Sequence, residues 1–185
     1  MRWFVAWPAR PDPMPSWPPP PRGVHALHPD DLHVTVAFLG AVGETAALRA
    51  WDRIWELPVD VLEATLGIVE PMGHPARASA LAAQLHGSDG RLVDVIERMR
   101  GPLYAAAGAL PDTRPARPHL TLARIGRRAG ASERAAALAW AASLDCRGCR
   151  LRLDRIALYV SVPGLDDGRR YQRVAERLVA SGPSG

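Results

Sequence analysis

The sequence contains no lysine, so all 23 of its basic residues are arginines. With 19 acidic residues the formal net charge is +4, and the sequence pI is about 9.8. Arginine presents a planar fork of N–H donors, which suits phosphate oxygens better than the compact ammonium group of lysine. The composition is therefore compatible with a nucleic-acid partner, although a mildly basic surface does not establish one by itself.

The sequence also lacks any apolar run of transmembrane length, and its start lacks the pattern of a signal peptide. We therefore expect a cytoplasmic protein with no membrane contact. Hydrophobic residues make up 48% of the 185 positions, which is ample for a core and argues against disorder. The length fits a single domain spanning residues 1–185, built as one unit or as two small lobes.

Cysteine is scarce, with only Cys146 and Cys149. A redox or metal site would need a supporting pattern such as a second cysteine pair, and none is present. A tight turn with Arg147 and Gly148 at its tip is the simpler interpretation.

Histidines and aspartates gather in residues 25–33, but the turn-like context argues against a metal cluster there. The residues of that imagined cluster are His25, His28, Asp30, Asp31 and His33. We expect neither a metal nor a cofactor.

What the sequence does contain is an internal repeat. Residues 32–40 (LHVTVAFLG) recur at one constant offset as residues 118–126 (PHLTLARIG). Their polar residues match, histidine with histidine and threonine with threonine: His33 with His119, and Thr35 with Thr121. Only Phe38 against Arg124 breaks the chemical match. A repeat of this kind must be explained before other features of the chain.

Both copies are typical of β-strands, since they are short, rich in aliphatic residues and end at a glycine. Side chains alternate between the two faces of a strand. Each copy should therefore present its histidine, its threonine and the following Ala37 or Ala123 on one face, with an apolar back for the core. Strict alternation turns Arg124 away from the histidine face.

The rest of the chain mixes strands and helices. Expected strands cover residues 1–7, 24–27, 59–69, 77–85 and 151–160, the last with a bulge at Asp154 and Arg155. Expected helices cover residues 45–57, 132–144 and a segment that opens near Ser88 or Asp89. Residues 8–23 are dominated by proline and should form an extended surface loop. Residues 171–179 suit either a helix or the second strand of a hairpin.

Several helix details can be predicted from caps and spacing. Thr45 is a plausible cap for the first helix, and Ser132 for the last. The first helix should bury Leu48, Trp51 and Trp55. The second should bury a stripe at helical spacing, Leu92, Val95, Ile96, Met99 and Leu103, and should be kinked or interrupted at Gly101 and Pro102.

Mixed local strand pairs and single helices favour an α+β fold over a doubly wound parallel sheet. The repeat suggests a bilobal, pseudo-symmetric molecule, each lobe having a mainly antiparallel sheet and helices. A cleft between the lobes would bring His33 and His119 together.

Two histidines in one cleft can act as an acid–base pair, because an ordinary pKa near 6.5 lets one be neutral while the other is protonated. Threonine hydroxyls can donate hydrogen bonds to phosphoryl oxygens. Such a pair can cleave a phosphodiester without a metal: one imidazole takes a proton from water and the other protonates the departing oxygen.

The paired His-x-Thr-x strands resemble the signatures of the 2H phosphoesterase superfamily. Their fuller context, together with residues 158–161, Gly168 and Tyr171, resembles the RNA 2′,3′-cyclic phosphodiesterases, also called 2′-5′ RNA ligases. The resemblance implies hydrolysis of RNA 2′,3′-cyclic phosphates to 2′-phosphates without a metal. It also implies that residues 171–178 form a strand, and that the proline loop replaces a helix.

The resemblance implies roles for individual residues. His33 would be the proton donor to the leaving 3′ oxygen, and His119 the base. Thr35, Thr121 and Arg124 would bind the substrate, which would be RNA with cyclic phosphate ends or a small cyclic nucleotide. A monomer is expected.

Three alternatives remain open. The substrate could be another cyclic or 2′-5′ linked nucleotide, because the catalytic strands would look the same. The same groups could also run the reaction in reverse, as a 2′-5′ RNA ligase. A module that binds RNA without turnover would share the cleft and the arginines.

Overall fold

The computed structural model describes residues 1–57, 59–87, 90–162, 165 and 167–179. Its strands are β1 (Trp3–Pro8), β2 (Val24–Ala26), β3 (His33–Gly40), β4 (Leu62–Pro71), β5 (Ala80–Gly87), β6 (His119–Ile125), β7 (Arg150–Leu153), β8 (Arg155–Ser161) and β9 (Tyr171–Leu178). Its helices are α1 (Glu44–Arg53), α2 (Arg91–Ala107) and α3 (Ala131–Ser143). Three short 3₁₀ turns are η1 (Pro29–Asp31), η2 (Ile54–Glu56) and η3 (Pro75–Arg77).

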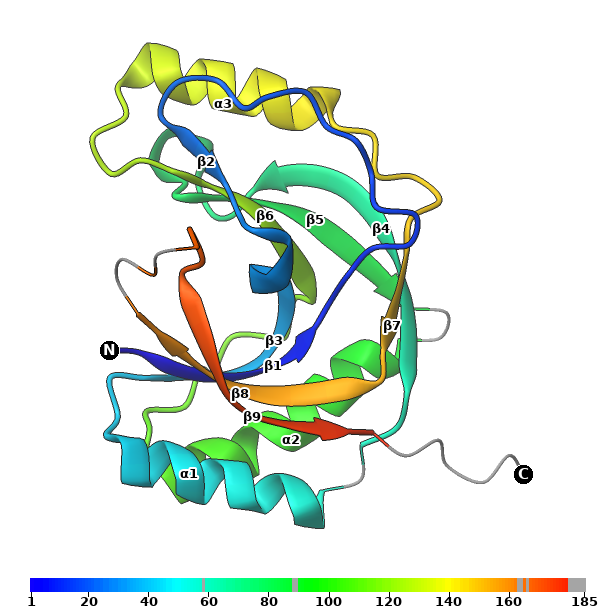
Figure 1. Ribbon diagram of the computed structural model, residues 1–185, viewed down its shortest axis with the longest axis vertical. Helices are drawn as coiled ribbons and strands as arrows, with labels where there is room; N and C mark the ends of the chain where they lie inside the picture. The colour runs from blue at the N-terminus through cyan, green and yellow to red at the C-terminus, as the bar shows by residue number, and fades with distance from the viewer. Residues whose placement is uncertain (58, 88–89, 163–164, 166, 180–185) are drawn as a thin grey trace.

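The described strands form one curled antiparallel sheet (Figure 1). Its order is β7-β4-β5-β6-β3-β1-β8-β9, and β2 pairs with β6 beside this path. Helix α3 covers the outside of the β4–β6 half, while α1 and α2 cover the half containing β3, β1 and β8 (Figure 1). The expected α+β class is confirmed. The expectation of a separate sheet in each lobe is wrong, because the two halves share one sheet that is continuous from β6 to β3.

The helices bury their apolar stripes against the outside of the sheet. The stripe predicted for α2 is confirmed in full, and the helix runs on through Gly101 and Pro102 without interruption. It begins after Gly90, and the expected opening at Ser88 or Asp89 lies outside the described residues. In α3 the cap is Gly130 rather than Ser132, and the Gly130 N–H donates to Glu133 Oε2 at 3.0 Å.

The stripe predicted for α1 is confirmed at Trp51 and wrong at Leu48 and Trp55. Its buried residues are Ala47, Ala50 and Trp51, whereas Leu48 and Trp55 are 38% and 66% exposed. Small alanines let the helix lie close to the sheet, so they take the inner face that size alone assigns to leucine and tryptophan. Gly43, rather than Thr45, is the N-cap.

The strand expected across residues 151–160 is in fact two strands in different parts of the sheet. β7 pairs with β4, whereas β8 pairs with β1, and Asp154 lies between them. The expected bulge in one strand is therefore the passage from one edge of the sheet towards the other. β9 is the hairpin partner of β8, which resolves residues 171–178 as a strand.

The proline loop contains no helix, as predicted. It runs beside α3 in Figure 1, where the Trp140 indole donates to the Pro18 carbonyl at 3.0 Å. Closer to β1, Asp12 forms a bridge with Arg150. The loop is therefore tied to the body of the protein at two points.

The cysteine turn is also confirmed. The Cys149 N–H donates to the Cys146 carbonyl at 3.2 Å, and Gly148 takes the positive φ that such a turn favours. Both thiols are buried and unpaired. Burial raises the pKa of Cys146 to about 11, which leaves the thiol a poor nucleophile at neutral pH.

No helix within the described ranges is long and apolar enough to cross a membrane.

A matched pair of leucines tests the core of the α2 face. Leu103 is fully buried, whereas Leu110 is 93% exposed just beyond the helix. We expect Leu103→Ala to lower the free energy of unfolding by about 2–5 kcal/mol, because it removes buried methyl groups and leaves a cavity. Leu110→Ala should change it by less than about 0.5 kcal/mol. Urea unfolding would measure both, and equal losses would contradict this packing.

Candidate active site

The two repeated strands are neighbours in the sheet. β3 and β6 are antiparallel, and Val34 pairs with Leu120. These residues occupy the same position in the two copies, directly after the histidine, so the repeat is related to itself by a local twofold axis. One residue to either side of this pair, the register sets His33 opposite Thr121 and His119 opposite Thr35. Opposed residues share a face of the sheet at about 4.5–5.5 Å between Cβ atoms.

A β-bulge follows at the same position in both copies. On β3 the register slips between Ala6–Thr35 and Val5–Ala37, and on β6 it slips between Ala82–Thr121 and Leu81–Ala123. The additional residues are Val36 and Leu122. Each strand therefore turns two successive residues into the core, Val36 with Ala37 and Leu122 with Ala123.

The bulges correct the prediction from strict alternation. Beyond them the phase changes, so Ala37 and Ala123 leave the histidine face while Phe38 and Arg124 join it. Phe38 pairs with Phe4, whose ring contacts His33 at a centroid distance of 4.7 Å. Arg124 donates to the Tyr171 hydroxyl at 3.5 Å, and the Tyr171 ring also contacts His33.

His33 opens β3 and is only 8% exposed. Its Nδ1 lies 2.6 Å from the Asp31 carbonyl, which can only accept, so Nδ1 carries the proton and Nε2 is the nitrogen left with a free lone pair. Three aromatic rings surround the imidazole: Phe4 at 4.7 Å, Tyr159 at 5.6 Å and Tyr171, edge-on, at 5.2 Å. Beneath these rings β1 and β8 carry small residues, Ala6 and Ala157, which are fully buried.

His119 repeats the same backbone arrangement in a more open setting. Its Nδ1 lies 2.7 Å from the Arg117 carbonyl, two residues before it, just as Asp31 lies two residues before His33. The same tautomer is therefore fixed in both copies, with Nε2 available to a ligand. Unlike His33, this residue is only partly buried.

Both imidazoles are held in the neutral form. Burial lowers the pKa of His33 to about 4; the hydrogen bond to Asp31 opposes this shift, while the positive charge of Arg124, and that of His119 when it is protonated, add to it. The pKa of His119 is also lowered, first by burial and then by Arg124 and Arg117. Because one arginine affects both rings, the two histidines and Arg124 share one electrostatic environment.

The threonines complete the face. Thr121 is 7% exposed, and Thr35 is half-buried on β3 beside Ala6. Opposite the histidines in the register, their hydroxyls lie where they could donate to the oxygens of an anion held between the imidazoles. The arrangement thus combines two neutral imidazoles, two hydroxyls and one guanidinium on a single face.

Local sequence carries no signal for the aromatic surroundings of His33. Phe4 and Tyr159 have the pattern of ordinary strand residues, and only the long-range pairing of β1 with β3 and β8 brings them to the imidazole. Tyr159 and Tyr171 stand out in the sequence through the family resemblance alone. In the sequence, Asp31 draws attention only as a member of the imagined metal cluster. In the structure its carbonyl orients His33.

The remaining histidines have local contacts of their own. His28 and His74 accept backbone N–H bonds that cap η1 and η3, from Asp30 and Ala76. His25 lies on β2 opposite Arg124. Among the residues that the structure describes, no group of three or more histidines, cysteines or acidic residues could hold a metal ion.

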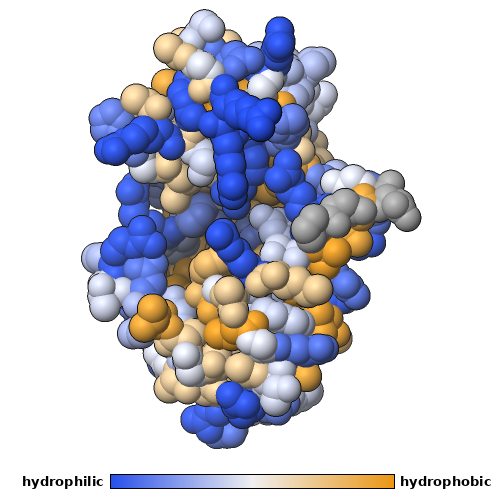
Figure 2. All heavy atoms as spheres, turned by 90° about the vertical axis from the view of Figure 1, so that its left-hand side faces the viewer, coloured by the Kyte–Doolittle hydropathy of each residue, from blue (hydrophilic) through white to orange (hydrophobic). Residues whose placement is uncertain are grey.

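The molecule is visibly hollowed between its two halves when seen from the left of Figure 1. Figure 2 shows this side, with hydrophilic side chains gathered over the upper half and around the hollow.

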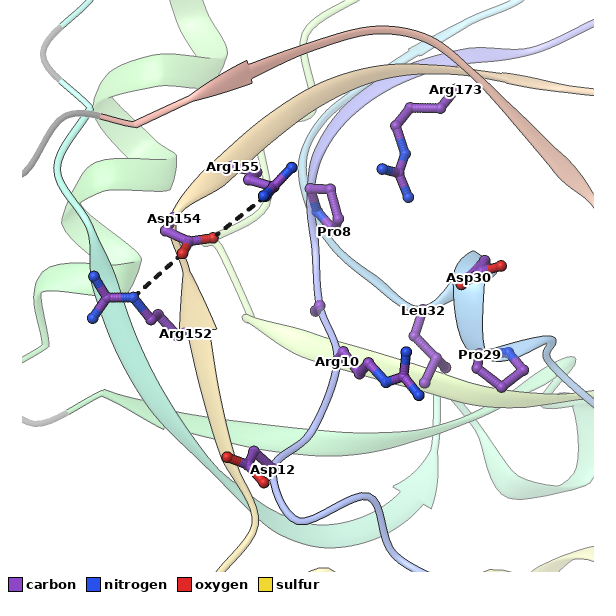
Figure 3. A pocket seen from close by; sticks show the side chains of 11 residues that line it. Pro8, Arg10, Asp12, Pro29, Asp30, Leu32, Arg152, Asp154, Arg155 and Arg173 are labelled. Atoms are coloured by element: carbon purple, nitrogen blue, oxygen red, sulfur yellow. Dashed lines mark hydrogen bonds and ion pairs between the residues drawn. The ribbon is translucent and has the colours of Figure 1, made fainter.

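A separate pocket of about 270 Å³ lies beside the start of the proline loop (Figure 3). It is rich in arginine, but carboxylates lie close to most of these groups: Asp154 contacts Arg152 and Arg155, and Glu176 contacts Arg155 and Arg173. Neither His33 nor His119 lines it. We therefore place the candidate chemistry at the paired strands rather than in this pocket.

Comparison with protein families and with named relatives gives a consistent match. A model described as LigT like Phosphoesterase matches residues 88–164, which include the second motif but not the first. The RNA 2′,3′-cyclic phosphodiesterase of Bacillus subtilis (strain 168) is 28% identical over 100 residues. That alignment covers 53% of this chain and 54% of the relative, so the match spans only about half of the relative's length.

Solved structures share the whole fold. Escherichia coli LigT, complexed with 3′-AMP, superposes with a TM-score of 0.68 at 19% identity, covering 97% of this chain and 98% of that one. TT0787 of Thermus thermophilus gives a TM-score of 0.66 at 20% identity, covering 98% and 99%. At these identities the likeness establishes the fold alone.

The shared electrostatics can be tested by removing one charge. Because Arg124 lowers the pKa of both histidines, Arg124→Gln should raise both values. NMR titration of the imidazole signals would measure the shifts. Arg98→Gln, on the exposed face of α2, is the matched control and should leave both pKa values unchanged. A shift of only one histidine would contradict the common environment.

Proposed function

We propose that this LigT-like 2H phosphoesterase, a distant homologue of RNA 2′,3′-cyclic phosphodiesterases, hydrolyses the 2′,3′-cyclic phosphate ends of RNA to 2′-phosphomonoesters. The observation that carries the proposal is the pairing of Val34 with Leu120. This register sets both histidines and both threonines on one face, as cleavage of a phosphodiester by two imidazoles requires.

Each histidine has one role in the proposed reaction. His119, the more exposed imidazole, takes a proton from water through Nε2 as the oxygen of that water attacks phosphorus. The bond from phosphorus to the 3′ oxygen breaks, and His33 gives the departing oxygen the proton of its own Nε2. Thr35 and Thr121 donate to the non-bridging oxygens, and Arg124 stabilises the negative charge that builds on them. After the step His119 releases its extra proton to solvent and His33 takes one up, which restores the starting pair.

The low pKa of His33 makes the acid role depend on the substrate. In the empty site burial and Arg124 keep this imidazole neutral at pH 7. A bound phosphodiester brings a negative charge to the Nε2 side, which favours the imidazolium and offsets the guanidinium. The proton that His33 donates is therefore gained as the substrate binds.

The substrate class rests on the relatives. The named relative from Bacillus subtilis is an RNA 2′,3′-cyclic phosphodiesterase, and the E. coli structure holds 3′-AMP, a nucleotide of the size of one RNA end. One chain carries both motifs, so a monomer suffices. Another cyclic or 2′-5′ linked nucleotide is the alternative substrate, and ligation through a 2′-5′ bond is the reverse of the same steps.

Activity measurements test the proposal directly. With 2′,3′-cyclic AMP and a short RNA carrying a 2′,3′-cyclic end, in excess chelator, we expect hydrolysis to the 2′-phosphate. His33→Ala and His119→Ala should each lower kcat by about 10²–10⁴-fold, since each removes one proton-transfer group. His74→Ala, at the exposed turn η3, is the control and should retain activity.

Three outcomes would count against this scheme: loss of activity on chelation, a 3′-phosphate product, or full activity in His119→Ala. Binding of the RNA without any turnover would instead favour a non-catalytic RNA-binding module. ³¹P NMR of the product separates the two phosphate isomers.

The pH dependence follows from the lowered pKa values. The productive pair holds one proton, so kcat/KM should be bell-shaped with its maximum between the two pKa values of the free enzyme. Both values lie below the ordinary 6.5, that of His33 at about 4, so the maximum should fall below pH 6.5. The kcat profile should peak at higher pH, because bound substrate favours the imidazolium. A kcat/KM maximum above pH 7 would contradict this.

A further inference from the structure

Asp31 is a buried carboxylate at the end of η1, only 1% exposed. A buried carboxylate needs hydrogen-bond donors. Its donors are two backbone N–H groups from the start of β9: Arg170 N lies 2.7 Å from Oδ2, and Tyr171 N lies 3.3 Å from Oδ1. No ion pair involves Asp31 in the part of the chain that the structure describes. The carboxylate thus fastens β9 to the segment just before β3, across a separation of 139 residues.

The same residue orients His33 through its backbone. The Asp31 carbonyl accepts the Nδ1–H bond at 2.6 Å, which fixes the tautomer and directs Nε2 into the site. Its carboxylate meanwhile holds Tyr171, whose ring stands edge-on to His33 at 5.2 Å and to Phe4 at 5.1 Å. The Tyr171 hydroxyl accepts from Arg124. Asp31 therefore acts on the imidazole in two ways. Its carbonyl orients the ring through Nδ1, and its carboxylate holds Tyr171 beside the ring.

The second motif has no such arrangement, although its backbone is the same. Arg117 stands at the corresponding position and supplies a carbonyl to His119. Its side chain, however, is 71% exposed and reaches Glu70 at 3.4 Å. A carboxylate that docks a neighbouring strand is therefore present beside His33, the more enclosed histidine, and not at the corresponding position beside His119.

We infer that Asp31 is a positioning residue for His33. Its carboxylate docks the start of β9 so that Tyr171 closes one side of the imidazole, while its carbonyl holds the ring with Nε2 toward the substrate. The inference rests on the proposed function only for its catalytic consequence, since the docking itself is a property of the free protein.

Asp31→Asn isolates the carboxylate. The variant keeps the backbone carbonyl that orients Nδ1, and it keeps the size of the side chain. It replaces one acceptor oxygen by an NH₂ group, which faces a backbone N–H and cannot accept from it. One of the two docking bonds is therefore lost and Tyr171 is released from His33. Asp30→Asn, one residue earlier in the same turn and exposed, is the matched control.

We expect Asp31→Asn to lower kcat by about 10-fold to 100-fold with less than about 3-fold change in KM, since the ring is misplaced rather than lost. Independently of activity, amide hydrogen exchange at Arg170 and Tyr171 should speed up. The imidazole NMR signals of His33 should shift while those of His119 stay in place. Asp30→Asn should match the unmodified protein in every measurement.

The readouts separate failure of this inference from failure of the proposed function. If the unmodified protein hydrolyses no cyclic phosphate, hydrogen exchange and the His33 signals still test the docking. An Asp31→Asn protein with unmodified kcat and unshifted His33 signals overturns the inference, as does an equal disturbance of both histidines. If Asp31→Asn does not fold, Tyr171→Ala tests the same link from β9: His33 signals should shift, and unshifted signals overturn the inference.

Discussion

The pairing of β3 with β6 is the constraint on which the rest of the site depends. It joins the two halves of the sheet, and the pair formed by Val34 and Leu120 lies between the two histidines. A shift of one residue in a strand sends every side chain to the opposite face. The apolar backs of the strands therefore hold the site in register, since Val34 and Leu120 are fully buried and could not turn to the histidine face without leaving the core.

The bulges show how a repeated sequence can give unequal halves. Val36 and Leu122 occupy equivalent positions and change the phase of their strands in the same way. The residues that the two bulges turn to the histidine face differ: Phe38 in the first copy and Arg124 in the second. The bulges thus deliver an apolar ring and a guanidinium to opposite sides of one approximate twofold.

Much of this could be predicted from the chain alone, and the parts that could not have a common cause. The paired strands, the α2 stripe from Leu92 to Leu103, the cysteine turn and the α+β class follow from local periodicity and composition. Alternation misplaces Arg124, because a bulge leaves no mark in the pattern of a short apolar strand. From the sequence, the break at Asp154 is predicted to be a bulge, because local sequence does not show which strands pair. In the structure β7 pairs with β4 and β8 with β1. The aromatic enclosure of His33 depends on contacts between β1, β3, β8 and β9, which only the folded topology brings together.

The docking of β9 on η1 also bears on the order in which the protein is completed. Both histidines and both threonines are already present in the first 121 residues, yet the strand that closes the site around His33 begins at Tyr171. Contacts so far apart in sequence form late, because the loop between them must be closed first. During synthesis the motif strands therefore emerge well before the residues that satisfy the Asp31 carboxylate. The enclosed site is complete only once the residues of β9 have left the ribosome.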